Sequence, residues 1–262
     1  MKSIYIAGGK ENNKAVKVVT SHLVALGHYV TRDAQDPSGW DATLRWGISY
    51  KGKKPALNAH VNEFDKLEAL NKFYKAGVPA PTVVSLQEAK NAHCGNGMEL
   101  PELSAERPWL ARKIKHSKGK DIAVCKTYAD VQEVLRNQTH EFFSVFIPTD
   151  AEYRVWVFKN KVLAVYEKVY KGVGEYQGYM RNRRFGFSFQ KKDDERENAT
   201  LKGPSIAAVK ALGMDWGAID VIKGKDGKYY ILEVNSMPVI EDEKRSSGIR
   251  LAKQVSLWAE GL

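Results

Sequence analysis

Two acidic residues and an amide near the end of the chain have the spacing of a metal-binding hairpin. Asp226-Gly227 lies between two apolar runs, and this dipeptide favours a two-residue β-hairpin loop because both residues tolerate a positive φ. If these two residues form the loop, the register places Asp220 directly opposite Glu233. Asn235 then lies on the same face, because side chains along a strand alternate between the two faces of a sheet.

The predicted carboxylate pair needs a compensating charge, since like charges placed opposite each other destabilise a sheet. A divalent cation between Asp220 and Glu233 removes this conflict. Carboxylate and amide oxygens suit Mg²⁺, which leaves its remaining positions to water or nucleotide phosphate. We therefore predict that Asp220, Glu233 and Asn235 bind one or two Mg²⁺ ions. The alternative is an exposed face on which two acids meet by chance, with the buried face formed by Ile219, Val221, Leu232 and Val234.

The composition is that of a globular protein. The chain has 262 residues, of which 43% are hydrophobic and 27% charged, so it can bury one large core or two small ones. No apolar run approaches the roughly 18 residues of a transmembrane helix, and the apolar stretch at the start is too short for a signal peptide. Cys94 and Cys125 form no CxxC motif, which argues against a disulfide scaffold or zinc ribbon and predicts a reduced, cytoplasmic setting. These features exclude the membrane, fibrous and disordered classes.

Basic residues outnumber acidic ones by 41 to 31, which gives a formal net charge of +10. They concentrate in residues 51–54, 112–120 and 181–184. This charge suits an anionic partner, whether nucleotide phosphates, nucleic acid or an acidic peptide. It is also compatible with lysines scattered over a solvated surface, so charge alone leaves these alternatives open.

The pattern of apolar residues predicts an α/β protein whose first unit is residues 1–80. A strand over 4–7, a helix over 15–26 and a second strand from residue 28 follow one another as in a βαβ unit. A helix over 62–77 precedes two prolines near residue 80, which mark the first boundary.

Two further units are predicted after this boundary. Residues 81–138 read as a small α/β unit, with helices over 86–93 and 128–135 and a strand from Trp109. In residues 139–262 strands dominate up to a helix over 205–212. Pro204 is expected to open that helix, since proline is favoured at the first helical position. A last helix is expected after Ser247-Gly248.

The hairpin resembles the metal-binding signature of ATP-grasp ligases. Asp220 precedes Glu233-Val234-Asn235-Ser236-Met237-Pro238 by thirteen residues, and in this the chain resembles in particular the RimK-like glutamate ligases and the phage carboxylate–amine ligases. The resemblance extends over roughly residues 60–262. It implies an ATP-grasp fold with an N-terminal βαβ-type domain, a small lid subdomain and a larger α+β subdomain that carries the metal hairpin. ATP would lie between the last two.

The resemblance also implies a phosphate-binding loop after the strand that begins at Trp109. Counting back from Ser117 puts Arg112 at the family's lysine position, whereas residue type favours Lys113, so both remain candidates. Backbone N–H groups, a hydroxyl and cations can close over a triphosphate. Ser117, Lys118 and Gly119 are the implied loop contacts, and a solvated basic loop is the alternative.

The segment Ser144-Val145-Phe146-Ile147 resembles the family's hinge strand, which contacts adenine. Family members often carry an acid near the position of Val145, so base recognition here would rest on backbone groups. Glu152 and Arg154 resemble an acid-x-Arg element whose acid can hold the ribose. Arg154 also has an ordinary interpretation: if Asn160-Lys161 closes a hairpin, Arg154 faces Glu167 as a cross-strand ion pair.

Arg181 and Arg184 match the place where the family supplies arginines to phosphate and to the acyl intermediate. Guanidinium groups suit such charge because they donate two parallel hydrogen bonds to oxygen pairs. The mixture of aromatic and basic residues around them also suits nucleic acid. Lys66, near the start of its predicted helix, resembles a family lysine, with a surface position as the alternative.

The function implied by the resemblance is ATP- and Mg²⁺-dependent ligation of a carboxylate to an amine. The carboxylate takes the γ-phosphate of ATP, and the amine then displaces phosphate to form an amide. Small-molecule or peptide substrates are expected, and the net charge suits an acidic macromolecular acceptor. Three alternatives remain: a kinase with a hydroxyl acceptor, a basic nucleic-acid-binding protein, and a degenerate module that binds nucleotide without catalysis.

Overall fold

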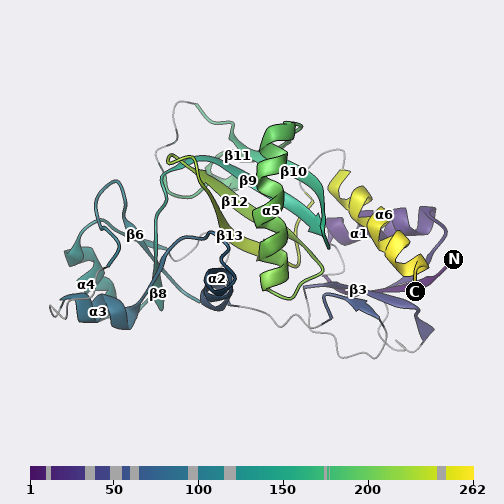
Figure 1. Cartoon of the computed structure of the whole chain (residues 1–262), viewed down its shortest axis with the longest axis horizontal. Helices are drawn as coiled ribbons and strands as arrows, with labels where there is room; N and C mark the ends of the chain where they lie inside the picture. The colour runs from purple at the N-terminus through teal and green to yellow at the C-terminus, as the bar shows by residue number, and fades with distance from the viewer. Residues whose placement is uncertain are drawn as a thin grey trace.

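A computed structural model shows three units in a row, with a five-stranded sheet in the middle and both chain ends at one end of the molecule (Figure 1). It describes residues 1–9, 13–32, 39–47, 55–59, 65–93, 100–114, 122–173, 176, 178–240 and 246–262.

The N-terminal unit is a parallel sheet in the order β2-β1-β3-β4, which confirms the predicted βαβ start. Its elements are β1 (Ser3–Gly8), α1 (Lys14–Ala25), β2 (Tyr29–Thr31), β3 (Ala42–Trp46) and β4 (Ala56–Leu57). Asn13 caps α1 by accepting from the N–H groups of Ala15 and Val16, which satisfies donors that have no partner inside the helix. The last helix, α6 (Ser246–Glu260), returns to this unit and lies beside α1 (Figure 1).

The second unit is an antiparallel sheet in the order β5-β8-β6-β7. Its core contains Trp109 and Phe143, both fully buried. Because β8 is an inner strand of this sheet, the second unit extends beyond the expected boundary at residue 138 and ends at the hinge after Val145. Its elements are β5 (Val83–Ser85), α3 (Leu86–His93), β6 (Trp109–Arg112), β7 (Ala123–Cys125), α4 (Tyr128–Asn137) and β8 (Phe142–Val145).

The central sheet has the order β11-β10-β9-β12-β13. One face packs on α2 and α5 through Val155, Ile219 and Ile231, and the other face meets the N-terminal unit through Trp216. The ring of Trp216 lies 4.8 Å from that of Trp46. The elements are α2 (Lys66–Lys75), β9 (Thr149–Phe158), β10 (Lys161–Tyr170), β11 (Phe187–Lys191), α5 (Glu195–Ala211), β12 (Trp216–Gly224) and β13 (Tyr229–Asn235).

The prediction that Pro204 opens a helix is wrong, because α5 begins nine residues earlier at Glu195 and holds Pro204 in its interior. The start is fixed by Asp194, whose side chain accepts from the N–H of Glu197. This capping arrangement occupies a donor at the helix start and outweighs the preference of proline for the first turn.

The β12–β13 hairpin keeps the predicted pairing through two differences that cancel. Its loop has three residues, Lys225 to Gly227, because the N–H of Gly224 donates to the carbonyl of Lys228 at 2.8 Å. This shifts the register by one position, and a bulge at Leu232 shifts it back. Asp220 therefore pairs with Glu233, as predicted.

The β9–β10 hairpin differs from its prediction. Its strands meet at Phe158 and Lys161, and a bulge at Leu163 follows. Arg154 is consequently opposite Tyr166 rather than Glu167, so the predicted Arg154–Glu167 pair is wrong. Glu167 instead forms an ion pair with Lys192 at 2.8 Å.

Candidate functional site

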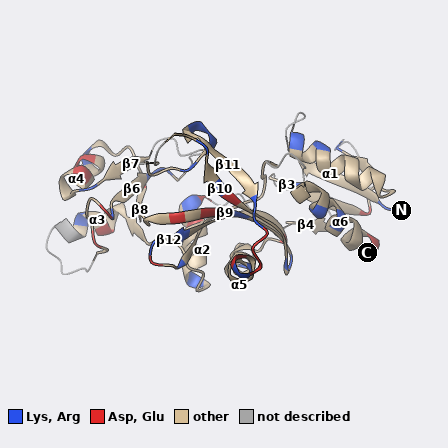
Figure 2. Cartoon of the chain, turned by 90° about the horizontal axis from the view of Figure 1, so that it is seen from above, with Lys and Arg blue, Asp and Glu red and all other residues tan. Residues whose placement is uncertain are grey.

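Charged side chains gather on one face of the central sheet, on the side that meets the N-terminal unit. The pairing of β12 with β13 places Asp220 opposite Glu233, and the pairing of β12 with β9 places Asp220 opposite Arg154. Figure 2 shows acidic positions within the strands of this central sheet. We call the group the charged cluster; it consists of Lys66, Glu152, Arg154, Lys168, Asp220 and Glu233.

Asp220 is held by a guanidinium fork. Arg154 Nε donates to Oδ1 of Asp220 at 2.8 Å, and its Nη2 donates to Oδ2 at 2.9 Å. Lys168 Nζ lies 3.9 Å from the same Oδ2. Burial by itself would raise the pKa of Asp220, but attraction to Arg154 and Lys168 outweighs it, so the pKa lies below its ordinary value. Asp220 is therefore an ionised carboxylate in a buried position.

Lys168 is shared between Asp220 and Glu152, and its ammonium donates to Oε1 of Glu152. Burial raises the pKa of Glu152, and Lys168 offsets this only in part. Burial would lower the pKa of Lys168, yet attraction to the two carboxylates raises it. The ring centroid of Phe189 lies 4.6 Å from the Arg154 guanidinium carbon and 5.4 Å from Lys168 Nζ. Phe189 thus supports both cations by cation–π attraction.

Glu233 is bound by two donors from its own chain. Lys66 Nζ donates to Oε2 at 2.8 Å, and Asn235 Nδ2 donates to Oε1 at 3.0 Å. Burial would raise the pKa of Glu233, but Lys66 and the hydrogen bonds hold it below its ordinary value. Lys66 is the first residue of α2, which Asp65 caps. The surface alternative for Lys66 is therefore wrong, because its side chain reaches the charged cluster.

The basic strand end supplies one residue that is electrostatically linked to this cluster. Burial lowers the pKa of Arg112, and attraction to Glu233 opposes that effect. The guanidinium carbon of Arg112 also lies 5.8 Å from the ring centroid of Phe142. Lys113 follows the strand and is half-buried. The expected loop residues Ser117, Lys118 and Gly119 lie outside the described residues.

The hinge segment crosses from the second unit to the central sheet. Ser144 and Val145 are buried at the end of β8. The ring of Phe146 meets that of Tyr179 edge-on, with centroids 5.0 Å apart. The four hinge residues therefore lie between two units, as expected of a segment that contacts a ligand at their junction, although their role in base binding remains a prediction.

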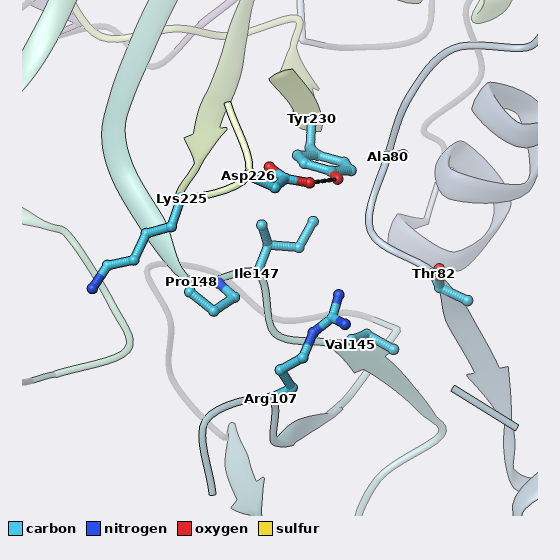
Figure 3. A pocket seen from close by; sticks show the side chains of 9 residues that line it. All are labelled: Ala80, Thr82, Arg107, Val145, Ile147, Pro148, Lys225, Asp226 and Tyr230. Atoms are coloured by element: carbon cyan, nitrogen blue, oxygen red, sulfur yellow. Dashed lines mark hydrogen bonds between the residues drawn. The ribbon is translucent and has the colours of Figure 1, made fainter. Parts of the chain in front are cut away.

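A pocket of about 260 Å³ lies beside this hinge (Figure 3). Tyr230 lines it and donates from its hydroxyl to Oδ2 of Asp226 at 2.6 Å. Tyr230 pairs with Ile222, which pairs on its other side with Glu152. Because directly paired residues share a face, the pocket lies further along the sheet face that carries the charged cluster. The remaining lining residues are Ala80, Thr82, Arg107, Val145, Ile147, Pro148 and Lys225.

The two predicted arginines have different positions. Arg181 donates to the carbonyl oxygens of Thr149 at 2.6 Å and Asp150 at 3.1 Å, and its charge acts on Glu152. Arg184 belongs to a short 3-10 helix, is exposed, and has its guanidinium carbon 5.8 Å from the ring centroid of Phe185. The structure thus brings Arg181 next to the charged cluster and leaves Arg184 at the surface.

The donor set around Asp220 fits Mg²⁺ better than a softer metal. Asp220 and Glu233 are cross-strand partners and Asn235 bonds to Glu233, and carboxylate and amide oxygens are the ligand types that Mg²⁺ prefers. No group of three His, Cys, Asp or Glu side chains with metal-binding geometry occurs in the part of the chain that the structure describes. A bound Mg²⁺ would therefore take two carboxylates, with its other ligands coming from the amide, water or a substrate.

The N-terminal unit contacts the chain that follows the metal hairpin. Gly47, directly after β3, has φ +73°, and a Cβ added there would lie 2.7 Å from the Cβ of Met237. Asn58 donates from Nδ2 to the carbonyl of Trp216 at 3.0 Å. These contacts attach the N-terminal unit to β12 and to the segment that follows β13.

Cys125 is a buried thiol without a disulfide. Burial, together with the nearby acids Asp130 and Glu133, raises its pKa to about 11, so it is protonated and unreactive at neutral pH. Cys94 lies outside the described residues. Every helix in the described ranges is too short or too polar to cross a bilayer.

Comparison with known proteins relates this site to a family. Residues 64–258 match the family model described as the RimK-like ATP-grasp domain. A protein of Haemophilus influenzae named probable alpha-L-glutamate ligase is 25% identical over 211 residues, which cover 77% of this chain and 64% of the relative. The chain thus spans less than two thirds of that relative's length.

Solved structures give the fold. The ATP-grasp ligase PsnB, complexed with minimal precursor, Mg and ADP, superposes with a TM-score of 0.66 at 15% identity over 98% of this chain and 97% of that chain. The RimK domain protein ATP-grasp from Sphaerobacter thermophilus gives 0.61 at 15% identity, over 98% and 100% of the two chains. These likenesses confirm the predicted fold.

Proposed function

Because the chain belongs to the family of RimK-like ATP-grasp domains, we propose that it is a ligase that uses Mg²⁺ and ATP to join a carboxylate to an amine. The observation that carries the proposal is the cross-strand pair Asp220–Glu233, which lies on the sheet face beside the hinge. Such a pair offers hard oxygen ligands next to a place where a nucleotide can lie between two units.

In this proposal, Asp220, Glu233 and Asn235 hold the metal through oxygen atoms. A bound Mg²⁺ supplies charge neutralisation at the phosphates and aligns the attacking oxygen. Arg112 and Lys66 act on the phosphates, since both already interact with Glu233 at the metal position. Ser117, Lys118 and Gly119 remain the predicted phosphate-loop contacts.

The base and ribose are assigned to the hinge side of the charged cluster. The segment Ser144-Val145-Phe146-Ile147 contacts the base through backbone groups, and the neighbouring pocket provides apolar walls. Glu152 is the predicted ribose ligand, but it is buried and bonded to Lys168. A ribose hydroxyl can therefore reach Glu152 only if the carboxylate is shared with Lys168.

The chemical sequence has two transfers. The substrate carboxylate oxygen attacks the γ-phosphorus and releases ADP. The amine then attacks the acyl carbon, expels phosphate and loses a proton to solvent. Of Arg181 and Arg184, Arg181 is the one next to the charged cluster, so we assign it to the charge that develops on the transferring group. Arg184 would have to move inward to share that role.

The substrates are proposed to be an amino acid and a peptide, in a cytoplasmic setting. PsnB is complexed with a precursor, and the Haemophilus influenzae relative is named a glutamate ligase. The formal net charge of +10 suits an acidic peptide. A kinase with a hydroxyl acceptor would use the same metal and phosphate groups, so the acceptor distinguishes the two activities. The family match favours ligation over nucleic-acid binding.

Titration calorimetry tests the proposal. The wild type is expected to bind ATP with Mg²⁺, and Glu233→Gln is expected to weaken binding at least tenfold, because it removes a metal ligand charge. Glu167→Gln is the matched control, since Glu167 forms a comparable 2.8 Å ion pair on β10 away from the cluster. It should bind as the wild type does.

Equal binding by wild type and Glu233→Gln would overturn the assignment of the metal site. If binding is as expected, release of ADP with pairs of amino acids and peptides identifies the substrates. ADP release that requires a hydroxyl acceptor and no amine would instead support the kinase.

A further inference from the structure

We propose that Lys66 is an exchangeable counter-ion of Glu233, so that a divalent cation enters the site together with a nucleotide and not before it. The inference rests on the proposed function, and it concerns the order in which this site fills. It begins from the observation that both predicted carboxylate ligands already carry cations from the chain itself.

Neither carboxylate offers an unengaged oxygen in this arrangement. On Asp220, Oδ1 and Oδ2 accept from the two nitrogens of the Arg154 fork. On Glu233, Oε2 accepts from Lys66 and Oε1 accepts from Asn235. A metal that binds both carboxylates therefore lies close to the positive charges of Arg154 and Lys66, and this repulsion favours replacing one of the two cations. The electrostatic conflict between the two acids is already relieved without a metal.

Lys66 is the cation that can leave at the lower cost. Its side chain is 24% exposed, donates one hydrogen bond to the cluster within the described part of the chain, and belongs to the first residue of α2. Arg154 is 13% exposed, uses two nitrogens on Asp220 and has its guanidinium 4.6 Å from the centre of the Phe189 ring. A flexible ammonium on one bond exchanges more readily than a stacked guanidinium fork.

A released Lys66 needs a new anionic partner, because a partly buried ammonium without one is unfavourable. Nucleotide phosphate provides that partner next to Glu233, so nucleotide binding frees the carboxylate for the metal. Metal alone must break the Lys66–Glu233 pair without this compensation. The two ligands therefore assist each other, and by linkage the effect on each affinity is the same.

The test measures metal binding directly. Mn²⁺ is titrated into the protein, the free ion is followed by electron paramagnetic resonance, and each titration is repeated with saturating AMPPNP. In Lys66→Met, Mn²⁺ alone is expected to bind about threefold to tenfold more tightly than in the wild type, the range that one partly exposed ion pair supports. AMPPNP should then strengthen Mn²⁺ binding by a smaller factor than it does in the wild type.

Two further variants separate exchange from a general effect of charge. Lys66→Arg keeps the cation and should bind Mn²⁺ alone as the wild type does. Lys72→Met removes another lysine of α2, one that forms an ion pair with Glu68 at 3.4 Å, and this variant should change neither titration. If Lys66 stayed beside the metal, its removal would change the Mn²⁺ affinity by the same factor with and without AMPPNP. If Lys66 exchanges, its removal changes the factor by which AMPPNP strengthens Mn²⁺ binding.

The inference is overturned if Lys66→Met binds Mn²⁺ alone no more tightly than the wild type, or if the enhancement by AMPPNP is unchanged. In that case the proposed nucleotide site still stands if the wild type binds Mn²⁺ in the presence of AMPPNP and Glu233→Gln does not. A wild type that binds neither ligand would overturn both.

Discussion

Replacing Arg154 by methionine removes the fork that holds Asp220, and we expect a large loss of folding stability. Both side chains are largely buried, with exposed fractions of 13% for Arg154 and 8% for Asp220. Methionine keeps an apolar contact for the Phe189 ring but brings no charge. Asp220 then retains Lys168, whose nitrogen lies 3.9 Å from Oδ2.

The expected loss in the free energy of unfolding is about 3 kcal/mol near neutral pH. Removing one partner of a buried pair costs about 3–5 kcal/mol, since the other charge stays buried, and Lys168 keeps the value at the low end. Lys192→Met is the matched control, because the Lys192–Glu167 pair has a 2.8 Å distance on the same sheet but side chains 30% and 28% exposed. It should cost less than about 1 kcal/mol.

The loss in the free energy of unfolding caused by Arg154→Met, called the deficit below, should become smaller at lower pH. In the wild type the pKa of Asp220 lies below its ordinary value. The stabilisation by its charge is therefore present above the unfolded-state pKa, about 3.9, and is lost as the pH falls through the folded-state pKa. Without Arg154, burial has less opposition, so the variant's carboxyl protonates at a higher pH. The deficit should shrink as the medium is acidified from neutral pH.

Urea unfolding followed by circular dichroism measures these differences for wild type, Arg154→Met and Lys192→Met. The reasoning is refuted if the two variants lose similar stability, or if the deficit of Arg154→Met grows on acidification. Arg154→Lys should fall between wild type and Arg154→Met, since it keeps the charge and loses the fork.

Two other predictions concern backbone and phosphate contacts. Gly47→Ala should lower the free energy of unfolding by about 3 kcal/mol, because the cost of a left-handed φ is added to that of a close contact with Met237. Gly227→Ala, with φ +78° and open space, should cost about 1 kcal/mol; equal losses in urea unfolding would contradict the contact. Arg112→Met should weaken AMPPNP binding about tenfold in calorimetry and Lys113→Met less than about threefold, whereas the reverse order would assign the phosphate cation to Lys113.

The sequence predicts the metal hairpin because the relevant signals are local. The Asp226-Gly227 turn and the alternation of side chains along each strand place Asp220 opposite Glu233 when the loop has two residues. The loop length was wrong by one residue, and the bulge at Leu232 compensated for it. A bulge depends on packing against neighbouring strands and cannot be predicted from the hairpin alone. The pairing of Asp220 with Glu233 is therefore predicted correctly from a hairpin geometry that is wrong.

The cations of the charged cluster could not be assigned from local patterns. Lys66 reaches Glu233 across 167 positions and Arg154 reaches Asp220 across 66. Lys168 was missed, although its spacing of two from Tyr166 on β10 puts both on the face that Arg154 shares. Strand order decides these partners, because only the order β10-β9-β12-β13 brings all of these residues together.

The predicted need for a metal followed from treating the two acids as uncompensated. In the fold, Arg154 and Lys66 already compensate the charges of the two acids. In our proposal, metal binding therefore exchanges one cation for another and is not needed to stabilise the site. The charged cluster has equal numbers of acidic and basic side chains, and Arg112 and Arg181 lie next to it. Among the described residues, the site therefore carries a positive surplus, which favours an anion. A metal–nucleotide complex, which retains negative charge, suits this surplus better than a bare divalent cation.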